Sequence, residues 1–136
     1  QDFSHAVKMT GLLYLTLSLF LKPSDTAAKN DGALTYVQNA ITYMNYHYPY
    51  DISIDDVAAF TGISRSHLYR IFMSHTGQSP KAYLSALRIR QACTLLKKSE
   101  ISITAIAASV GFENSLYFSK VFKRLKGMTP TEYREN

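Results

Sequence analysis

The chain has 136 residues, which is enough for one ordinary domain or two very small ones. A hydrophobic content of 46% with 18% charged residues excludes an intrinsically disordered chain. The formal net charge is +5, and residues 53–136 carry the whole positive excess, with twelve basic and six acidic side chains. This distribution favours an anionic partner for the second part of the chain.

The single cysteine, Cys93, cannot form an intramolecular disulfide, which is typical of a cytoplasmic protein. The four histidines are scattered and show no His-x-x-x-His pair, so we expect no metal and no other cofactor. The most apolar stretch, residues 12–21, has about half the length that a membrane-spanning helix needs, so we expect no membrane partner.

Residues 4–21 predict a helix that is apolar nearly all round and must therefore be buried against another element. Residues 22–33 are rich in small, polar and helix-breaking residues and predict a linker. Two interpretations of the segment 1–21 remain open. It is either the last helix of an upstream domain or a self-association element, or it is a helix that packs on the part of the chain after the linker.

From residue 34 onward, apolar residues recur at helical spacing and no segment has the pattern of a strand, so we expect an all-α fold. The helix over 80–98 is apolar around much of its circumference, which predicts burial between two units. The pattern near residue 120 predicts an inner stripe of Phe118, Val121, Phe122 and Leu125. His47 and His75 are expected to be partly buried. The expected N-caps are Ser53, Ser64, Ser79, Ser102, Asn114 and Thr129, and the expected closing glycines are Gly77 and Gly127.

The sequence contains an internal repeat. Residues 54–58 match residues 103–107, and Gly62 matches Gly111, at an offset of 49. Beyond the turn the offset becomes 50, because one extra residue lies in the second turn; the pairs there include Phe72 with Phe122 and Tyr83 with Tyr133. Each unit is a short helix, a glycine turn and a second helix, which is the helix-turn-helix pattern. We therefore expect a bipartite domain over 34–136, with subdomains at 34–79 and 99–136 joined by a linker helix at 80–98.

The second helix of each unit has an outer face opposite its apolar stripe, at 100° per residue. Each outer face carries a cation beside short polar and large apolar side chains. Arginine and lysine can bind guanine edges, and tyrosine and leucine can contact the thymine methyl group. An ordinary solvated face is the alternative, but Tyr69, Met73 and Leu116 favour an interface. The outer faces comprise Ser66, Tyr69, Arg70 and Met73 in the first unit, and Leu116, Ser119, Lys120 and Lys123 in the second.

Other side chains are candidates for contacts with the DNA backbone. Arg65, Ser115 and Tyr117 flank the helix starts, where they could contact bases or phosphates. Arg88 is the more plausible structural ion-pair member of the two arginines on the linker helix. The remaining cations that we expect near phosphates are Lys81, Arg88, Arg90, Lys123, Arg124 and Lys126.

The linker helix is roughly 27 Å long at 1.5 Å per residue. The two recognition helices at its ends could therefore sit about one DNA turn apart and occupy successive major grooves of a somewhat bent duplex. No glycine-rich phosphate loop, nucleophile elbow or pair of catalytic carboxylates is present, so we expect no enzyme activity. A helical protein-interaction module is the alternative function.

The second unit resembles the signature of the AraC/XylS family of transcription regulators: Ile103-x-x-Ile106-Ala107-x-x-x-Gly111-Phe112, then Tyr117-Phe118-Ser119-x-x-Phe122-Lys123, then Gly127-x-Thr129-Pro130-x-x-Tyr133-Arg134. The first unit and the linker pattern Arg88-Ile89-x-x-Ala92-x-x-Leu95-Leu96 also fit. The resemblance covers roughly residues 34–136. It implies a homeodomain-like, seven-helix unit that binds double-stranded DNA in sequence-specific fashion and regulates transcription.

The resemblance also implies roles for individual residues and partners. By analogy, the base-contacting positions are Ser66, Tyr69, Arg70, Ser115, Leu116, Ser119 and Lys120. The backbone-contacting set is Arg65, Lys81, Arg90, Tyr117, Lys123, Arg124 and Lys126. Full-length members usually carry an upstream domain that dimerises and binds a small molecule such as a sugar, and RNA polymerase is a further expected partner. The helix at 4–21 resembles the tail of such a domain.

Overall fold

The computed structural model describes the backbone of residues 28–136 and the side chains from residue 32 onward. The helix expected at 4–21 and most of the linker expected at 22–33 lie outside the described residues. Residues 33–136 form one compact unit, and the description below concerns that unit.

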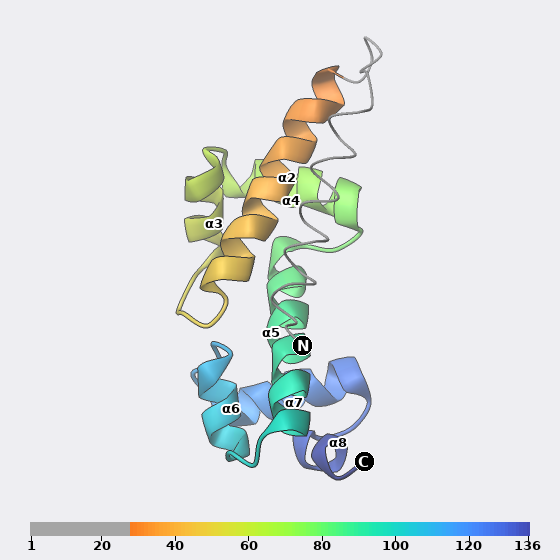
Figure 1. Ribbon diagram of the computed structural model, residues 1–136. Helices are drawn as coiled ribbons and strands as arrows, with labels where there is room; N and C mark the ends of the chain where they lie inside the picture. Colours follow the sequence, from red (N-terminus) through yellow and green to blue (C-terminus); the bar gives the residue numbers. More distant parts are fainter. Residues whose placement is uncertain (1–27) are drawn as a thin grey trace. The chain divides into compact units, whose positions relative to one another are not determined.

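The described residues form helices and contain no strand, which confirms the all-α prediction (Figure 1). The helices are α2 (Ala28–His47), α3 (Ile54–Thr61), α4 (Arg65–Thr76), α5 (Pro80–Lys98), α6 (Ile103–Ser109), α7 (Ser115–Lys126) and α8 (Pro130–Glu135). α2 begins six residues before the start predicted at Leu34, so residues 28–33 are helical. Once a helix has nucleated, each further residue adds a hydrogen bond at little cost, and Ala28 and Lys29 are good helix formers.

The polar residues expected at the helix ends do cap them. The Ser53 side chain accepts from the Asp56 backbone N–H, and the Asp56 carboxylate accepts from the Ser53 backbone N–H at 2.8 Å, which completes a capping box. The same arrangement joins Thr129 and Glu132 at the start of α8. Single caps at the expected positions begin the other helices: Ser64, Ser79, Ser102 and Asn114.

The internal repeat of the sequence is reproduced in three dimensions. Gly77 and Gly127 end α4 and α7 with φ of 73° and 76°, values that glycine adopts without strain. Phe72 meets Tyr83 edge-on at 5.4 Å between ring centroids, and the matching pair Phe122 and Tyr133 does so at 5.5 Å. Each glycine turn therefore leads the chain back so that an aromatic ring of the next helix covers the core phenylalanine.

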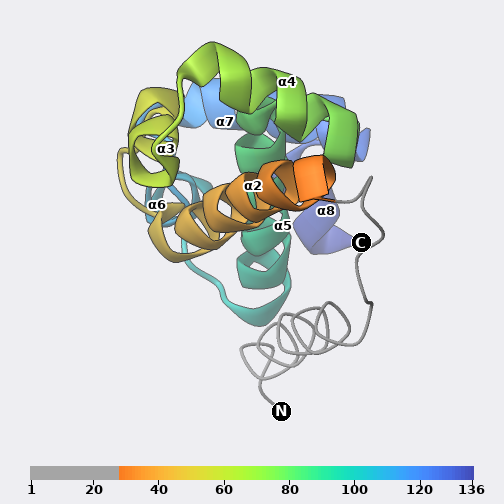
Figure 2. The same cartoon turned by 90° about the horizontal axis from the view of Figure 1, so that it is seen from above.

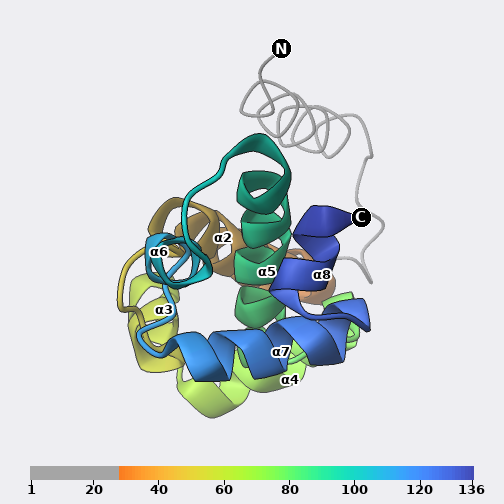
Figure 3. The ribbon, with the colours of Figure 1, turned by 90° about the horizontal axis from the view of Figure 1, so that it is seen from below.

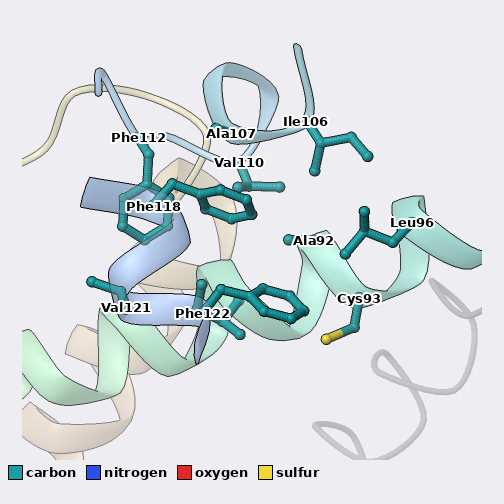
Figure 4. Close-up of a cluster of buried hydrophobic side chains, with 11 residues drawn as sticks. Ala92, Cys93, Leu96, Ile106, Ala107, Val110, Phe112, Phe118, Val121 and Phe122 are labelled. Carbon is teal, nitrogen blue, oxygen red and sulfur yellow. The ribbon is translucent and has the colours of Figure 1, made fainter. Parts of the chain in front are cut away.

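Each subdomain has its own hydrophobic core, and α5 contributes to both. Leu84 and Leu87 lie in the first core, with Val57, Leu68 and Phe72. The second core is built on Ile89, Ala92, Cys93 and Leu96 of α5, with the side chains of α6 and α7 converging on them (Figure 4). The expectation that the linker helix is buried between two units is confirmed.

Two predicted burials are wrong. Leu125 has the angular position of the inner stripe of α7 but is 45% exposed, because the second core extends no further along α7 than Phe122. His75 is exposed near the end of α4, where its Nδ1 lies 2.8 Å from the Ile71 carbonyl oxygen. Periodicity gives the direction of a side chain but not the presence of a neighbour to cover it.

The second helices of the two subdomains, α4 and α7, lie at different levels along α5 (Figure 1) and on the same side of it (Figures 2 and 3). Their inner faces are fixed by Leu68 and Phe72 in α4 and by Phe118 and Phe122 in α7, all fully buried. The outer faces of both helices are consequently free to meet one ligand.

Candidate nucleic-acid interface

The side chains predicted for the outer face of α4 are exposed in the structure. Tyr69 is 48% exposed and Met73 is 42% exposed, although both are large and partly apolar. An open hollow on this face is lined by the first-unit residues assigned to DNA contact: Arg65, Ser66, Tyr69 and Arg70. The four side chains expected to act together in the first unit therefore share one surface.

Arg65 is the member of this group with an acidic neighbour. Its guanidinium lies 3.5 Å from the Asp55 carboxylate of α3, and both side chains are exposed. Such a pair contributes little to stability, because water screens it. Asp55 also lowers the net positive charge of this edge.

The outer face of α7 is more basic. Leu116 is 75% exposed, and Lys120 and Lys123 are exposed on the same side of the helix. Ser115 and Ser119 are half-buried. Tyr117 is 49% exposed, and its ring centroid lies 6.0 Å from that of Phe112.

Cations continue along the last turn of α7, where Lys123, Arg124 and Lys126 complement the negative end of the helix dipole. α7 has no acidic residue between Ser115 and Lys126. All three of these side chains are exposed, as are Lys81 and Arg90 of α5. The residues assigned to the DNA backbone are thus accessible, and α7 carries the densest positive charge.

Arg88 differs from the other cations. Its Nε donates to the Tyr48 carbonyl at 2.9 Å, and its Nη2 donates to the Tyr50 carbonyl at 3.0 Å. Its guanidinium carbon lies 5.9 Å from the centre of the Phe112 ring. Partial burial lowers the pKa of Arg88 from its ordinary value, and the charge of Asp51 opposes this.

These contacts support a structural role for Arg88, which the sequence analysis gave beside a contact with DNA phosphates. Its hydrogen-bond partners are main-chain carbonyls in place of the expected carboxylate. Sequence patterns did not reveal this site, because carbonyl acceptors exist at every residue and only the fold selects two of them.

The described part of the chain contains neither a candidate metal centre nor a membrane-spanning helix. No group of three or more histidine, cysteine, aspartate or glutamate side chains there could hold a metal ion. None of the described helices combines the length and apolar character needed to cross a membrane.

Comparison with known proteins identifies the family. A family model described as a helix-turn-helix domain matches residues 57–136. The chain is 33% identical over 130 residues to the Msm operon regulatory protein of Streptococcus mutans, covering 93% of this chain and 47% of that protein. It is 37% identical over 100 residues to the lactose operon transcription activator of Staphylococcus xylosus, covering 74% of this chain and 36% of that protein. The chain thus spans about half the length of these relatives or less.

A solved structure supports the same assignment. The DNA-binding domain of AdpA, a global transcriptional factor crystallised in complex with a target DNA, matches this fold with a TM-score of 0.70 and 28% sequence identity. The match covers 73% of this chain and 89% of that domain. The two glycine-turn units, the shared linker helix and these relatives lead to one conclusion: the chain belongs to the AraC/XylS family of helix-turn-helix transcription regulators.

Proposed function

We propose that this chain binds double-stranded DNA in sequence-specific fashion, with α4 and α7 in successive major grooves on one face of the duplex. The observation that carries the proposal is the presence of two exposed helix faces, one per subdomain, on the same side of α5 (Figures 1 and 3). An α-helix fits the major groove, and a bipartite protein reaches two grooves when its helices are about one DNA turn apart.

The residues on these faces suit base contacts at corresponding positions. Arg70 of α4 and Lys120 of α7 are related by the internal repeat, and both are exposed. Arginine can bind guanine O6 and N7 through two hydrogen bonds, and lysine makes the same contact less rigidly. Tyr69 and Leu116 add apolar surface that suits the thymine methyl group. The remaining base-contacting assignments are Ser66, Ser115 and Ser119.

The proposed backbone contacts surround these faces. They are the seven residues Arg65, Lys81, Arg90, Tyr117, Lys123, Arg124 and Lys126, all exposed. Contacts of this kind position the protein on the duplex and supply most of the sequence-independent affinity.

Further proposals concern the whole protein, because the chain spans only part of its relatives. We propose that it regulates transcription in the cytoplasm without catalysing a reaction. The lactose operon activator of Staphylococcus xylosus supports a sugar or another small metabolite as effector. Dimerisation through an upstream domain and contact with RNA polymerase are the corresponding proposals for partners.

The test is a selection with the 136-residue chain on a library of random duplexes. We expect an enriched sequence with two blocks whose centres lie about 10 base pairs apart, one for each recognition helix. Enrichment of a single block would overturn the two-groove arrangement. A failure to enrich any sequence would favour the alternative function, a helical protein-interaction module whose exposed Leu116 and Tyr69 contact another protein.

A further inference from the structure

The two turns of the repeat differ in what surrounds their glycines. Gly62 and Gly111 both have positive φ, at 82° and 99°, so both turns require a glycine backbone. A Cβ at Gly62 would meet open space. A Cβ at Gly111 would overlap the Tyr48 carbonyl oxygen and lie 2.7 Å from Arg88 Nε. Of these two glycines, only Gly111 lies too close to another part of the molecule to accept a side chain.

The elements that meet at Gly111 belong to different subdomains. Tyr48 and Tyr50 follow the end of α2 in the first subdomain, whereas Gly111 and Phe112 form the turn between α6 and α7 in the second. Arg88 joins them, with two hydrogen bonds to the first subdomain and its guanidinium over the Phe112 ring of the second. We call these five residues the Arg88 clasp.

The Arg88 clasp lies at the point of α5 where the two hydrophobic cores meet. Arg88 lies between Leu87, whose side chain is in the first core, and Ile89, whose side chain is in the second. A single helix between two cores can bend and twist at such a junction. Contacts beside the helix axis oppose both motions, and a guanidinium bound to two carbonyls is more rigid than a lysine ammonium would be.

We propose that Arg88 is a positioning residue that sets the spacing of the two DNA half-sites this chain accepts. It does so by holding the turn before α7 against the segment after α2, so that α4 and α7 keep one separation and one relative rotation. This inference rests on the proposed DNA-binding function. Inserting one base pair between the half-sites would shift one by about 3.4 Å and rotate it by about 35°, which a rigid pair of helices cannot follow.

The experiment measures affinity for duplexes derived from the selected sequence. In these duplexes, one base pair is added or removed between the two half-sites. For the unmodified chain, we expect affinity to fall at least about tenfold away from the selected spacing, because one half-site loses its base contacts. Arg88→Ala should weaken binding at the selected spacing and reduce this discrimination to about threefold or less. Arg88→Lys should do the same. It keeps the positive charge but lacks the planar guanidinium that binds the two carbonyls.

Two matched controls separate positioning from charge and from backbone strain. Arg90→Ala removes an exposed arginine from the same helix and should weaken binding to all duplexes by one common factor. Gly111→Ala should reduce the spacing discrimination as Arg88→Ala does. Gly62→Ala introduces a positive-φ alanine in open space and should leave the discrimination unchanged.

The folding of each variant is checked by thermal unfolding and by affinity for a duplex with a single half-site, measured below the melting temperature of the least stable variant. The proposal is overturned if Arg88→Ala and Arg88→Lys retain the tenfold discrimination, or if they weaken every duplex by one factor as Arg90→Ala does. If Arg88→Ala does not fold, Arg88→Lys decides by the same criteria. Failure of the unmodified chain to prefer any duplex is a different outcome and refutes the DNA-binding function itself.

Discussion

Arg70 and Lys120 are expected to differ in how strongly they discriminate between bases at the proposed interface. Both occupy the same position of the repeat and both are exposed, but their surroundings differ. Arg70 lines a hollow with Tyr69 and Arg65, whereas Lys120 lies on a helix whose last turn holds three more cations. We expect Arg70 to discriminate between bases more strongly, because its planar fork matches guanine and an ammonium group does not.

Arg70→Ala should cost roughly 1–3 kcal/mol of binding free energy on the selected duplex and relax base preference at one position. Lys120→Ala should have a smaller effect of the same kind in the other half-site. The measurement is affinity for the selected duplex and for all three substitutions at each base pair. Lys81→Ala is the control, because an exposed cation that contacts phosphate should weaken all duplexes alike. Equal losses for Arg70→Ala on every duplex would show that Arg70 contacts phosphate instead.

At the scale of the element, the recognition helices depend on the short helices that pack across them. α3 has eight residues, too few to be stable alone, and its start is secured by the Ser53–Asp56 capping box. The backbone N–H and the hydroxyl of Ser53 both donate to the Asp56 carboxylate, and these hydrogen bonds lower the pKa of Asp56 from its ordinary value of 3.8. The charged carboxylate is thus the form that stabilises α3.

The capping box predicts a dependence of stability on pH. A carboxyl whose pKa is lowered by folding adds stability at pH values above its unfolded pKa and loses that contribution as the pH falls through its folded pKa. Asp56→Asn should therefore lower the melting temperature at neutral pH, and the difference from the unmodified chain should shrink below pH 3.8. Thermal unfolding followed by circular dichroism measures it. Glu100→Gln, an exposed carboxyl between α5 and α6, is the control. A difference that stays constant down to about pH 2.5 would contradict this role of the carboxylate.

For the whole molecule, the distribution of charge matters more than its total. The net charge of +5 is the sum of an acidic first part and a basic second part, and the exposed cations among the described residues lie on α4, α5 and α7. Six cations are assigned to the DNA backbone: Arg65, Lys81, Arg90, Lys123, Arg124 and Lys126. Each phosphate neutralised by a cation releases a bound counterion, so the salt dependence of binding counts these contacts.

We expect the logarithm of the binding constant to fall with the logarithm of salt concentration with a slope of about −5, from a contribution near −0.9 for each of the six cations. Lys126→Ala should reduce the steepness by about 0.9 and leave the selected sequence unchanged. Arg88→Ala should leave the slope unchanged, because its guanidinium is bound to carbonyls. Fluorescence anisotropy between about 50 and 200 mM salt measures all three. A slope close to zero would favour a protein partner.

Many features of the individual helices follow from residues that are near one another in the sequence. The caps, the closing glycines, the burial of Phe118, Val121 and Phe122, and the exposure of Tyr69 and Leu116 were predicted from spacing and side-chain chemistry. The errors concern the burial of two side chains and the start of one helix. Leu125 and His75 are exposed because no neighbouring element covers them, which periodicity does not encode. The start of α2 at Ala28 follows from helix propagation beyond the apolar stripe.

The sequence by itself determined the all-α fold, the repeated unit and the faces of the recognition helices, because helix periodicity, capping and turn geometry act over a few residues. Only the tertiary structure decided what happens between the repeats. It made Gly111 a crowded contact and left its counterpart Gly62 open, and it bound Arg88 to two carbonyls about forty residues away in sequence. Such contacts depend on how two cores pack against one helix, and no local pattern carries that information.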